Sequence, residues 1–202
     1  MNLWREIDLA AFPLTTLKPQ MPLYRIYPRR WPLSGISSAV SEPGIPGWFC
    51  GEGDHRFDFP VGDAGTCYLS TSELGAAIEV IGRSSGRFEI KERRLATLNV
   101  RDPLVVLDLT SYRNPTSGGL INSILCRQKL ISGRPSYIVS QSFAHFVFGN
   151  NISGIKWLSW RDPEYRSENL AIFRSEAGAD DGTFFDITCT ADIKRTLIEK
   201  AI

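Results

Sequence analysis

The order of the apolar segments along this chain constrains its fold more than any other sequence feature. Alternating or continuous apolar patterns predict strands over residues 23–27, 66–70, 88–100, 104–109, 154–160, 169–174 and 183–188. Helical spacing predicts helices from Ser72 to Gly82 or Gly86, and over residues 120–130, 136–148 and 191–202. Helices and strands do not alternate strictly, as they would in a doubly wound sheet. We therefore predict an α+β fold, with a mixed or antiparallel β core flanked by helices.

The length of 202 residues fits one domain, because a single core stops growing only at roughly 250–300 residues. We expect a short helical arm and a proline-punctuated lead-in over residues 1–20. The core is predicted over residues 21–175, and a C-terminal strand and helix over residues 176–202. Residues 31–66 are rich in glycine, proline and serine but also in aromatic residues, which predicts an ordered binding loop with a strand near Arg56 and Phe57.

Composition excludes several classes of function. The net charge of +1 gives no general attraction to nucleic acid or to an anionic membrane. No run approaches the roughly 18 apolar residues of a membrane span, and the N-terminus does not resemble a secretory signal. The four cysteines are widely spaced, so we expect no metal site and reduced thiols in a cytoplasm. P-loop, GxGxxG, HExxH and GxSxG motifs are absent from the sequence.

Two features place chemistry-bearing residues together. A strand–turn–helix unit carries Tyr68 and Glu79, 11 residues apart, and the helix face around Glu79 is built from small residues that permit a close approach. A set of arginines flanks the aromatic loop, namely Arg25, Arg29, Arg30 and Arg56. Each residue alone also has an ordinary interpretation, as a solvated or core side chain. Together, guanidinium groups for a pyrophosphate, aromatic rings for a flat base and one carboxylate are what a nicotinamide dinucleotide site needs.

Three sequence blocks in order resemble the RES-domain family, over roughly residues 20–175. Tyr24-Arg25-Ile26 resembles its opening Tyr-Arg motif. Arg56-Phe57, Thr66–Ser70 and Ala76–Glu79 together look like its "GRF … LYLA … A..E" block, although His55 stands where the glycine is usual. Residues 154–159 and 169–173 look like its "GIRYPS … NLALF" block.

This resemblance implies a fold similar to that of ADP-ribosyltransferase toxins and an activity that destroys NAD⁺, with no further cofactor. The arginine, glutamate and serine for which the family is named fall on Arg25, Glu79 and Ser159, which we expect to be catalytic. Arg25, Arg56, Tyr68 and Tyr24 are expected to bind the dinucleotide. The implied partner is a small antitoxin with an Xre-like DNA-binding domain that covers the NAD⁺ site, and a homodimer is left open.

Cleavage of the nicotinamide–ribose bond passes through an oxocarbenium-like state, as in glycoside cleavage. We expect Glu79 to stabilise the developing positive charge, Arg25 and Arg56 to hold phosphate oxygens, and Tyr68 to pack on the nicotinamide. Water, phosphate or a protein are the alternative acceptors. Ala77 occupies the position where a protein transferase often has an acidic or polar residue, which favours hydrolysis or phosphorolysis. A catalytically silent binding module is the remaining alternative.

Overall fold

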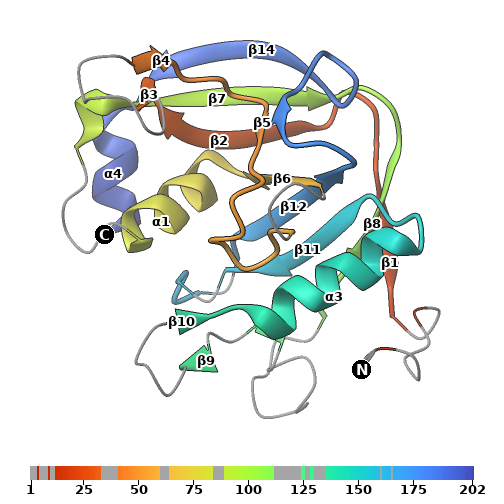
Figure 1. Ribbon diagram of the computed structural model, residues 1–202. Coiled ribbons are helices and arrows are strands. Elements are labelled where there is room, and N and C mark those ends of the chain that lie inside the picture. The colour runs from red at the N-terminus through yellow and green to blue at the C-terminus, as the bar shows by residue number, and fades with distance from the viewer. Residues whose placement is uncertain are drawn as a thin grey trace.

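The computed structural model describes most of the chain, with gaps at several loops. The described residues are 4, 9, 12–32, 41–59, 64–83, 89–111, 124–125, 128–129, 135–159, 161–164 and 166–202. In the described part, an eight-stranded sheet has the order β1-β8-β11-β12-β6-β2-β7-β14 (Figure 1). Its strands are β1 (Leu14–Leu17), β2 (Pro22–Pro28), β6 (Gly65–Ser70), β7 (Arg93–Val100), β8 (Leu104–Asp108), β11 (Gly154–Leu158), β12 (Glu168–Arg174) and β14 (Phe185–Asp192).

The neighbouring strands of this sheet are antiparallel, apart from the parallel pair β8–β11. Three small ribbons complete the strands: β3 (Arg30–Pro32) with β4 (Ser41–Pro43), β5 (Trp48–Phe49) with β13 (Gly178–Ala179), and β9 (Gln128–Lys129) with β10 (Pro135–Ser136). The helices with described bounds are α1 (Glu73–Arg83), α3 (Ile138–Gly149) and α4 (Arg195–Ala201), with a 3₁₀ turn over Ile90–Glu92. The predicted α+β class, with a mixed, mostly antiparallel sheet flanked by helices, is confirmed.

The sheet folds over at the junction of β6 and β2. These two strands share a single residue pair, Tyr24 opposite Ser70, whereas β6 pairs with β12 at six positions and β2 with β7 at seven. A buried cluster lies between the two halves and takes Leu23 and Leu98 from one half and Leu170 from the other. Burial of these side chains holds the halves together, while the backbones of β6 and β2 separate beyond Tyr24.

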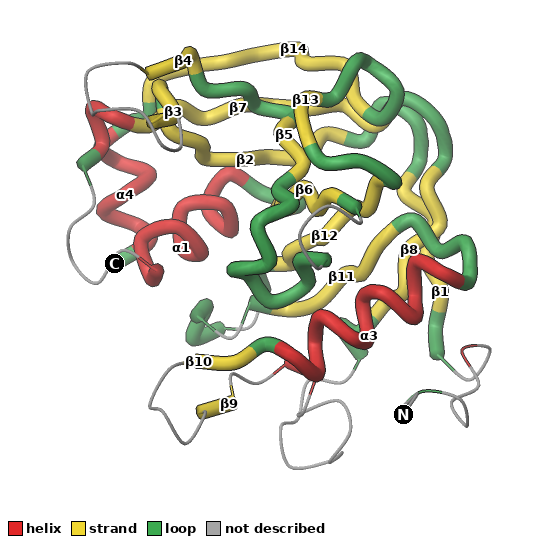
Figure 2. The backbone as a smooth tube through the Cα atoms, viewed as in Figure 1, coloured by secondary structure: helices red, strands yellow, loops and turns green. Residues whose placement is uncertain are grey.

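Helices cover the outer faces of the folded sheet (Figure 2). Helices α1 and α4 pack on β2 and β7 through a cluster that includes Ala77, Ile26 and Ile198. Helix α3 packs on β11 and β8, where Phe143 and Ile155 are fully buried. Glu79 therefore sits on the helix that lies beside the junction of the two half-sheets.

Most of the predicted strands and helices are found, and one strand that was not predicted depends on a distant partner. Residues 14–17 were expected in the lead-in to the core but form β1, because they pair with β8, about 90 residues away in sequence. Arg56 and Phe57 lie in a turn, not a strand. The segment predicted as one strand over residues 88–100 begins with the 3₁₀ turn, and Phe88 lies outside the described residues.

The remaining differences concern two predicted helices. In the segment predicted as helical over residues 120–130, Ile124 and Leu125 are helical but 128–129 form β9, and the other positions lie outside the described residues. At the C-terminus, β14 runs to Asp192 and the helix starts only at Arg195. Within the described ranges, no helix is long and apolar enough to cross a membrane, and no three histidine, cysteine or acidic side chains gather as a metal site.

Candidate functional site

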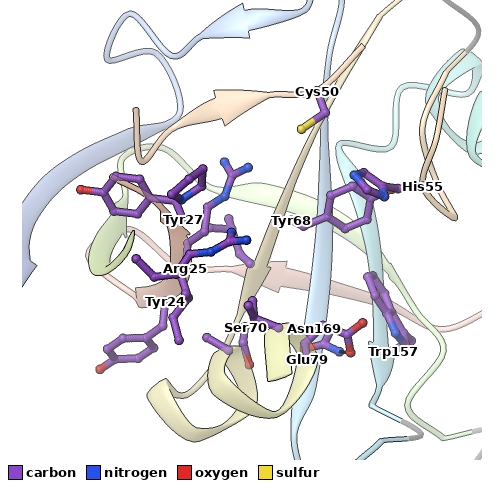
Figure 3. Close-up of a pocket in the computed structure, with 16 residues that line it drawn as sticks. Tyr24, Arg25, Tyr27, Cys50, His55, Tyr68, Ser70, Glu79, Trp157 and Asn169 are labelled. Carbon is purple, nitrogen blue, oxygen red and sulfur yellow. Dashed lines mark hydrogen bonds between the residues drawn. The ribbon is translucent and has the colours of Figure 1, made fainter. Parts of the chain in front are cut away.

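A cleft of about 360 Å³ opens where β2 and β6 separate. Its walls come from β2, β6 and α1, from the ends of β11 and β12, and from the segment that carries Cys50 and His55. Figure 3 shows Glu79, Asn169 and Trp157 on one side of this cleft and Tyr24 and Tyr27 on the other. The cleft thus joins a carboxylate on α1 to the part of β2 that does not pair with β6.

The Glu79 carboxylate is held by three neighbouring side chains. Its Oε2 atom accepts hydrogen bonds from Ser159 Oγ at 3.2 Å and from Asn169 Nδ2 at 3.0 Å. Its Oε1 atom lies 3.8 Å from Arg161 Nε. The Glu79 side chain keeps 19% of its surface exposed, so the carboxylate is oriented by the protein yet still borders the cleft. The structure brings the predicted Glu79 and Ser159 into direct contact.

Ser159 follows β11 and is fixed by a tight turn. Its backbone N–H donates to Ser167 O at 2.7 Å, and its Oγ accepts from the Arg161 N–H at 3.3 Å. The Asp162 carboxylate accepts hydrogen bonds from the backbone N–H groups of residues 164, 166 and 167 and from Ser167 Oγ. Burial raises the pKa of Asp162, but these hydrogen bonds, led by the one from Ser167, outweigh it and lower the pKa. The turn is therefore held by a charged cap, which positions Ser159.

Local sequence explains why α1 presents Glu79 to the cleft. Ser72 caps the helix as predicted, because its Oγ accepts the Gly75 N–H at 3.0 Å. Ala77 and Ile78 are buried, and this packing fixes the rotation of the helix. The small residues serve close protein packing: a Cβ atom at Gly75 would lie 2.2 Å from Ser70 Oγ, and one at Gly82 would lie 2.6 Å from Arg161 Cδ. The predicted close approach on this face is made by side chains of the protein itself.

Arg25 lines the cleft and also anchors its wall. Its Nη1 atom donates to Pro46 O at 2.9 Å, to Trp48 O at 2.6 Å and to Cys67 Sγ at 3.2 Å. These bonds tie β5 and the residues just before it to β2 and β6, and they leave Arg25 only 8% exposed. Burial raises the pKa of the Cys67 thiol to about 11 despite the opposing charge of Arg25. Cys67 is therefore a neutral partner of the guanidinium at physiological pH.

Tyr68 is held in the cleft by its hydroxyl group. The hydroxyl donates to Asp58 Oδ1 at 2.8 Å and accepts the Phe57 N–H at 2.9 Å. The His55 ring meets the Tyr68 ring edge-on at 5.8 Å, and both side chains line the cleft. Asp58 is fully buried, so the ring of Tyr68 is fixed by groups that solvent does not reach. Tyr24, another predicted binding residue, also lines the cleft.

The predicted set of arginines is not brought together. Arg29 pairs with Asp192 on β14, and Arg30 is exposed. Arg56 is half-buried in the turn before Phe57 and is not among the described residues that line the cleft. Of the four arginines only Arg25 borders it, so binding of a dinucleotide by Arg56 stays a prediction.

Sequence reasoning missed several residues of the site. Trp157 and Asn169 point into the cleft from β11 and β12, and Arg93 lines it from the start of β7. Asn169 carried a signal in the sequence, because it is a polar residue at the start of an apolar strand. The structure buries it almost fully. Arg93 carried none, since charged residues surround it in sequence. The described lining of the cleft thus combines one carboxylate, two guanidinium groups and several aromatic rings, and can accept a ligand with both a cationic ring and anionic groups.

Comparison with known proteins gives a family match and structural similarity to solved chains. The RES domain family matches residues 22–188. A chain in the crystal structure of the M. tuberculosis MbcT–MbcA toxin–antitoxin complex is similar in structure, with a TM-score of 0.56 and 20% sequence identity. The similarity covers 92% of this chain and 91% of that one, which shows a shared fold. No curated protein sequence matches the chain.

Proposed function

Since the chain belongs to the RES domain family, we propose that it is a toxin-type enzyme that cleaves the nicotinamide–ribose bond of NAD⁺. The observation that carries this proposal is the Glu79 carboxylate, held by Ser159, Asn169 and Arg161 at the border of a cleft that also contains aromatic rings and guanidinium groups. A fixed carboxylate beside flat rings is what stabilisation of a sugar cation requires.

The chemistry assigns a role to Glu79. As neutral nicotinamide leaves, positive charge develops on the ribose, and the transition state resembles an oxocarbenium ion. A carboxylate that is already oriented stabilises this charge without reorganising, so it binds the transition state more strongly than the substrate. Ser159 and Asn169 both donate to Oε2, which fixes the plane of the carboxylate. Ser159 in this proposal orients Glu79.

Binding of the substrate is assigned to the rest of the cleft. Tyr68 and Trp157 offer aromatic surfaces next to Glu79, where the pyridinium ring packs. Arg25 supplies positive charge toward the phosphates, although its Nη1 atom also holds the wall of the cleft. Tyr24 lines the opposite side, and Arg56 stays a proposed contact outside the described lining. NAD⁺ is the substrate, and no additional cofactor is invoked.

The acceptor is proposed to be water or phosphate. Ala77, two positions before Glu79, is fully buried against α4 and β2 and offers no polar group to an acceptor protein. The proposed partner is an antitoxin protein that covers the cleft, in line with the toxin–antitoxin complex that contains the structural neighbour. An Xre-like domain in that antitoxin is part of the proposal, as is action in the cytoplasm.

The experiment is NAD⁺ consumption by the purified protein, with and without inorganic phosphate, with products identified by mass. The wild-type protein is expected to release nicotinamide together with ADP-ribose, or with its 1-phosphate when phosphate is present. Glu79→Gln keeps the shape but removes the charge, and we expect turnover to fall about 10²–10³-fold. Glu73→Gln is the matched control, since Glu73 is an exposed residue at the start of the same helix.

Three outcomes distinguish the alternatives. Unchanged turnover by a folded Glu79→Gln protein contradicts the assigned role of Glu79. Binding of NAD⁺ without any release of nicotinamide identifies a silent binding module. Transfer of ADP-ribose to an added protein, with no free ADP-ribose formed, identifies a mono-ADP-ribosyltransferase.

A further inference from the structure

Arg93 is a cation of the cleft that the proposed mechanism leaves unused. It is the first residue of β7, is half-buried, and lines the same cleft as Glu79. In the described part of the chain, no hydrogen bond or ion pair holds its guanidinium group. A half-buried guanidinium has five N–H donors to satisfy, so its position favours an anionic ligand.

Its neighbours on the sheet are all engaged. Arg94 donates to Thr190 O on β14, Arg29 pairs with Asp192, and Arg25 makes its three hydrogen bonds to the wall of the cleft. Arg93 thus differs from Arg25 on β2, Arg29 just after β2 and Arg94 on β7, which all have described partners. The difference is one of position, because Arg93 borders the cleft whereas Arg94 does not.

Strand register places Arg93 away from Glu79. Asn169, which holds Glu79, pairs with Ser70, and Ser70 pairs with Tyr24, so these residues form one row across the sheet. Arg93 pairs with Pro28, four residues further along β2. At roughly 3.4 Å per residue this is about 14 Å along the strand. A ligand whose ribose contacts Glu79 must therefore extend past that ribose to reach Arg93.

We propose that Arg93 binds a phosphoryl group of the ligand, at the end of the cleft remote from Glu79. A guanidinium fork matches phosphate oxygens in a bidentate geometry. Pro28, which pairs with Arg93 and also lines the cleft, supplies an apolar wall next to the charge. The proposal rests on the proposed function for the identity of the ligand, a nicotinamide dinucleotide. The phosphoryl group comes either from its pyrophosphate or from a free phosphate that accepts the ribosyl group.

Calorimetric binding of ADP-ribose, adenosine and inorganic phosphate tests this directly. For a pyrophosphate contact, Arg93→Gln is expected to weaken ADP-ribose binding at least about tenfold, roughly 1.4 kcal/mol, and to leave adenosine binding unchanged. Arg93→Lys keeps the charge but loses the fork, so it should recover part of the affinity. Arg94→Gln is the matched control, with the same loss of charge on the same strand, and should bind like the wild type.

Each remaining outcome has a defined meaning. If Arg93→Gln binds ADP-ribose normally but needs more than about tenfold more phosphate for half-maximal phosphorolysis, Arg93 binds the free phosphate. The inference is overturned if Arg93→Gln changes neither property, or if the wild-type protein binds neither ADP-ribose nor phosphate. If the wild type does not cleave NAD⁺ but binds ADP-ribose through Arg93, the proposed function fails and the inference stands.

Discussion

Substitution of Asn169 tests whether the hydrogen bonds to Glu79 act in catalysis. Asn169→Ala removes the donor that lies 3.0 Å from Glu79 Oε2. Asn169→Asp nearly preserves the size of the side chain but places an acceptor and a negative charge at that position. If Asn169 orients the carboxylate, both variants lose activity and the aspartate variant loses more. If Asn169 only fills space, the aspartate variant is the milder one.

The expected losses of activity follow from the two interactions that the substitutions change. A hydrogen bond to a charged group contributes about 1.5–3 kcal/mol, so Asn169→Ala should lower kcat by about 10–150-fold. Two carboxylate oxygens 3.0 Å apart repel by about 5–6 kcal/mol at an effective dielectric constant of about 20. Sharing of a proton relieves part of this repulsion, so the expected loss for Asn169→Asp is more than about a hundredfold. Asn169 contacts Glu79, and the proposed role of Glu79 is to stabilise the transition state. The substitutions should therefore change kcat more than KM.

The assay is the initial rate of nicotinamide release from NAD⁺, measured over a range of substrate concentrations to separate kcat from KM. Circular dichroism and thermal unfolding check that each variant is folded. Asn99→Ala and Asn99→Asp are the controls, because Asn99 bonds only weakly to Gln20 at 3.4 Å in an exposed position. A folded Asn169→Asp protein that is more active than Asn169→Ala would refute the orienting role.

Two further predictions concern stability. Gly75→Ala should lower the free energy of unfolding by about 1–3 kcal/mol, because its Cβ would lie 2.2 Å from Ser70 Oγ. Gly149→Ala has open space around it and should be neutral or stabilising. Urea unfolding of both variants measures the two changes. Burial raises the pKa of Cys67 to about 11, so between about pH 9 and pH 11 the thiol ionises in the unfolded chain but not in the folded one. Stability should fall across this interval, and less so in Cys67→Ala; equal pH dependence of the two proteins contradicts the assigned burial.

Short-range sequence patterns predicted the elements that carry the site. Ser72 was expected to cap the helix of Glu79, and it does, because a cap needs only residues a few positions apart. The strand that carries Arg25 followed from alternation of apolar and polar residues, and the strand over residues 66–70 that carries Tyr68 was also predicted. The predicted joint set is partly assembled: Arg25, Tyr24, Tyr68 and Glu79 line one cleft, and Ser159 contacts Glu79.

Long-range pairing was beyond the sequence patterns. Residues 14–17 form a strand only because they pair with β8, and nothing in their own sequence specifies that partner. The same holds for Arg29, in the bend just after β2, and for Arg93, the first residue of β7, which both have other charges near them in sequence. Arg29 forms an ion pair with Asp192 on β14, whereas Arg93 lines the cleft. Only the pairing of β7 with β2 and with β14 decides which side chains lie near these guanidinium groups.

The sequence by itself determined the α+β class, the local elements, and the residues Arg25, Tyr68, Glu79 and Ser159 as candidates, because hydrophobic periodicity, helix capping and family motifs act over short distances along the chain. Tertiary structure alone decided where the sheet folds over, since β6 and β2 share a single residue pair and packing of the two halves fixes their separation. That separation creates the cleft. It also brings Asn169 and Arg161 to Glu79 from 90 and 82 positions away, which no local pattern encodes.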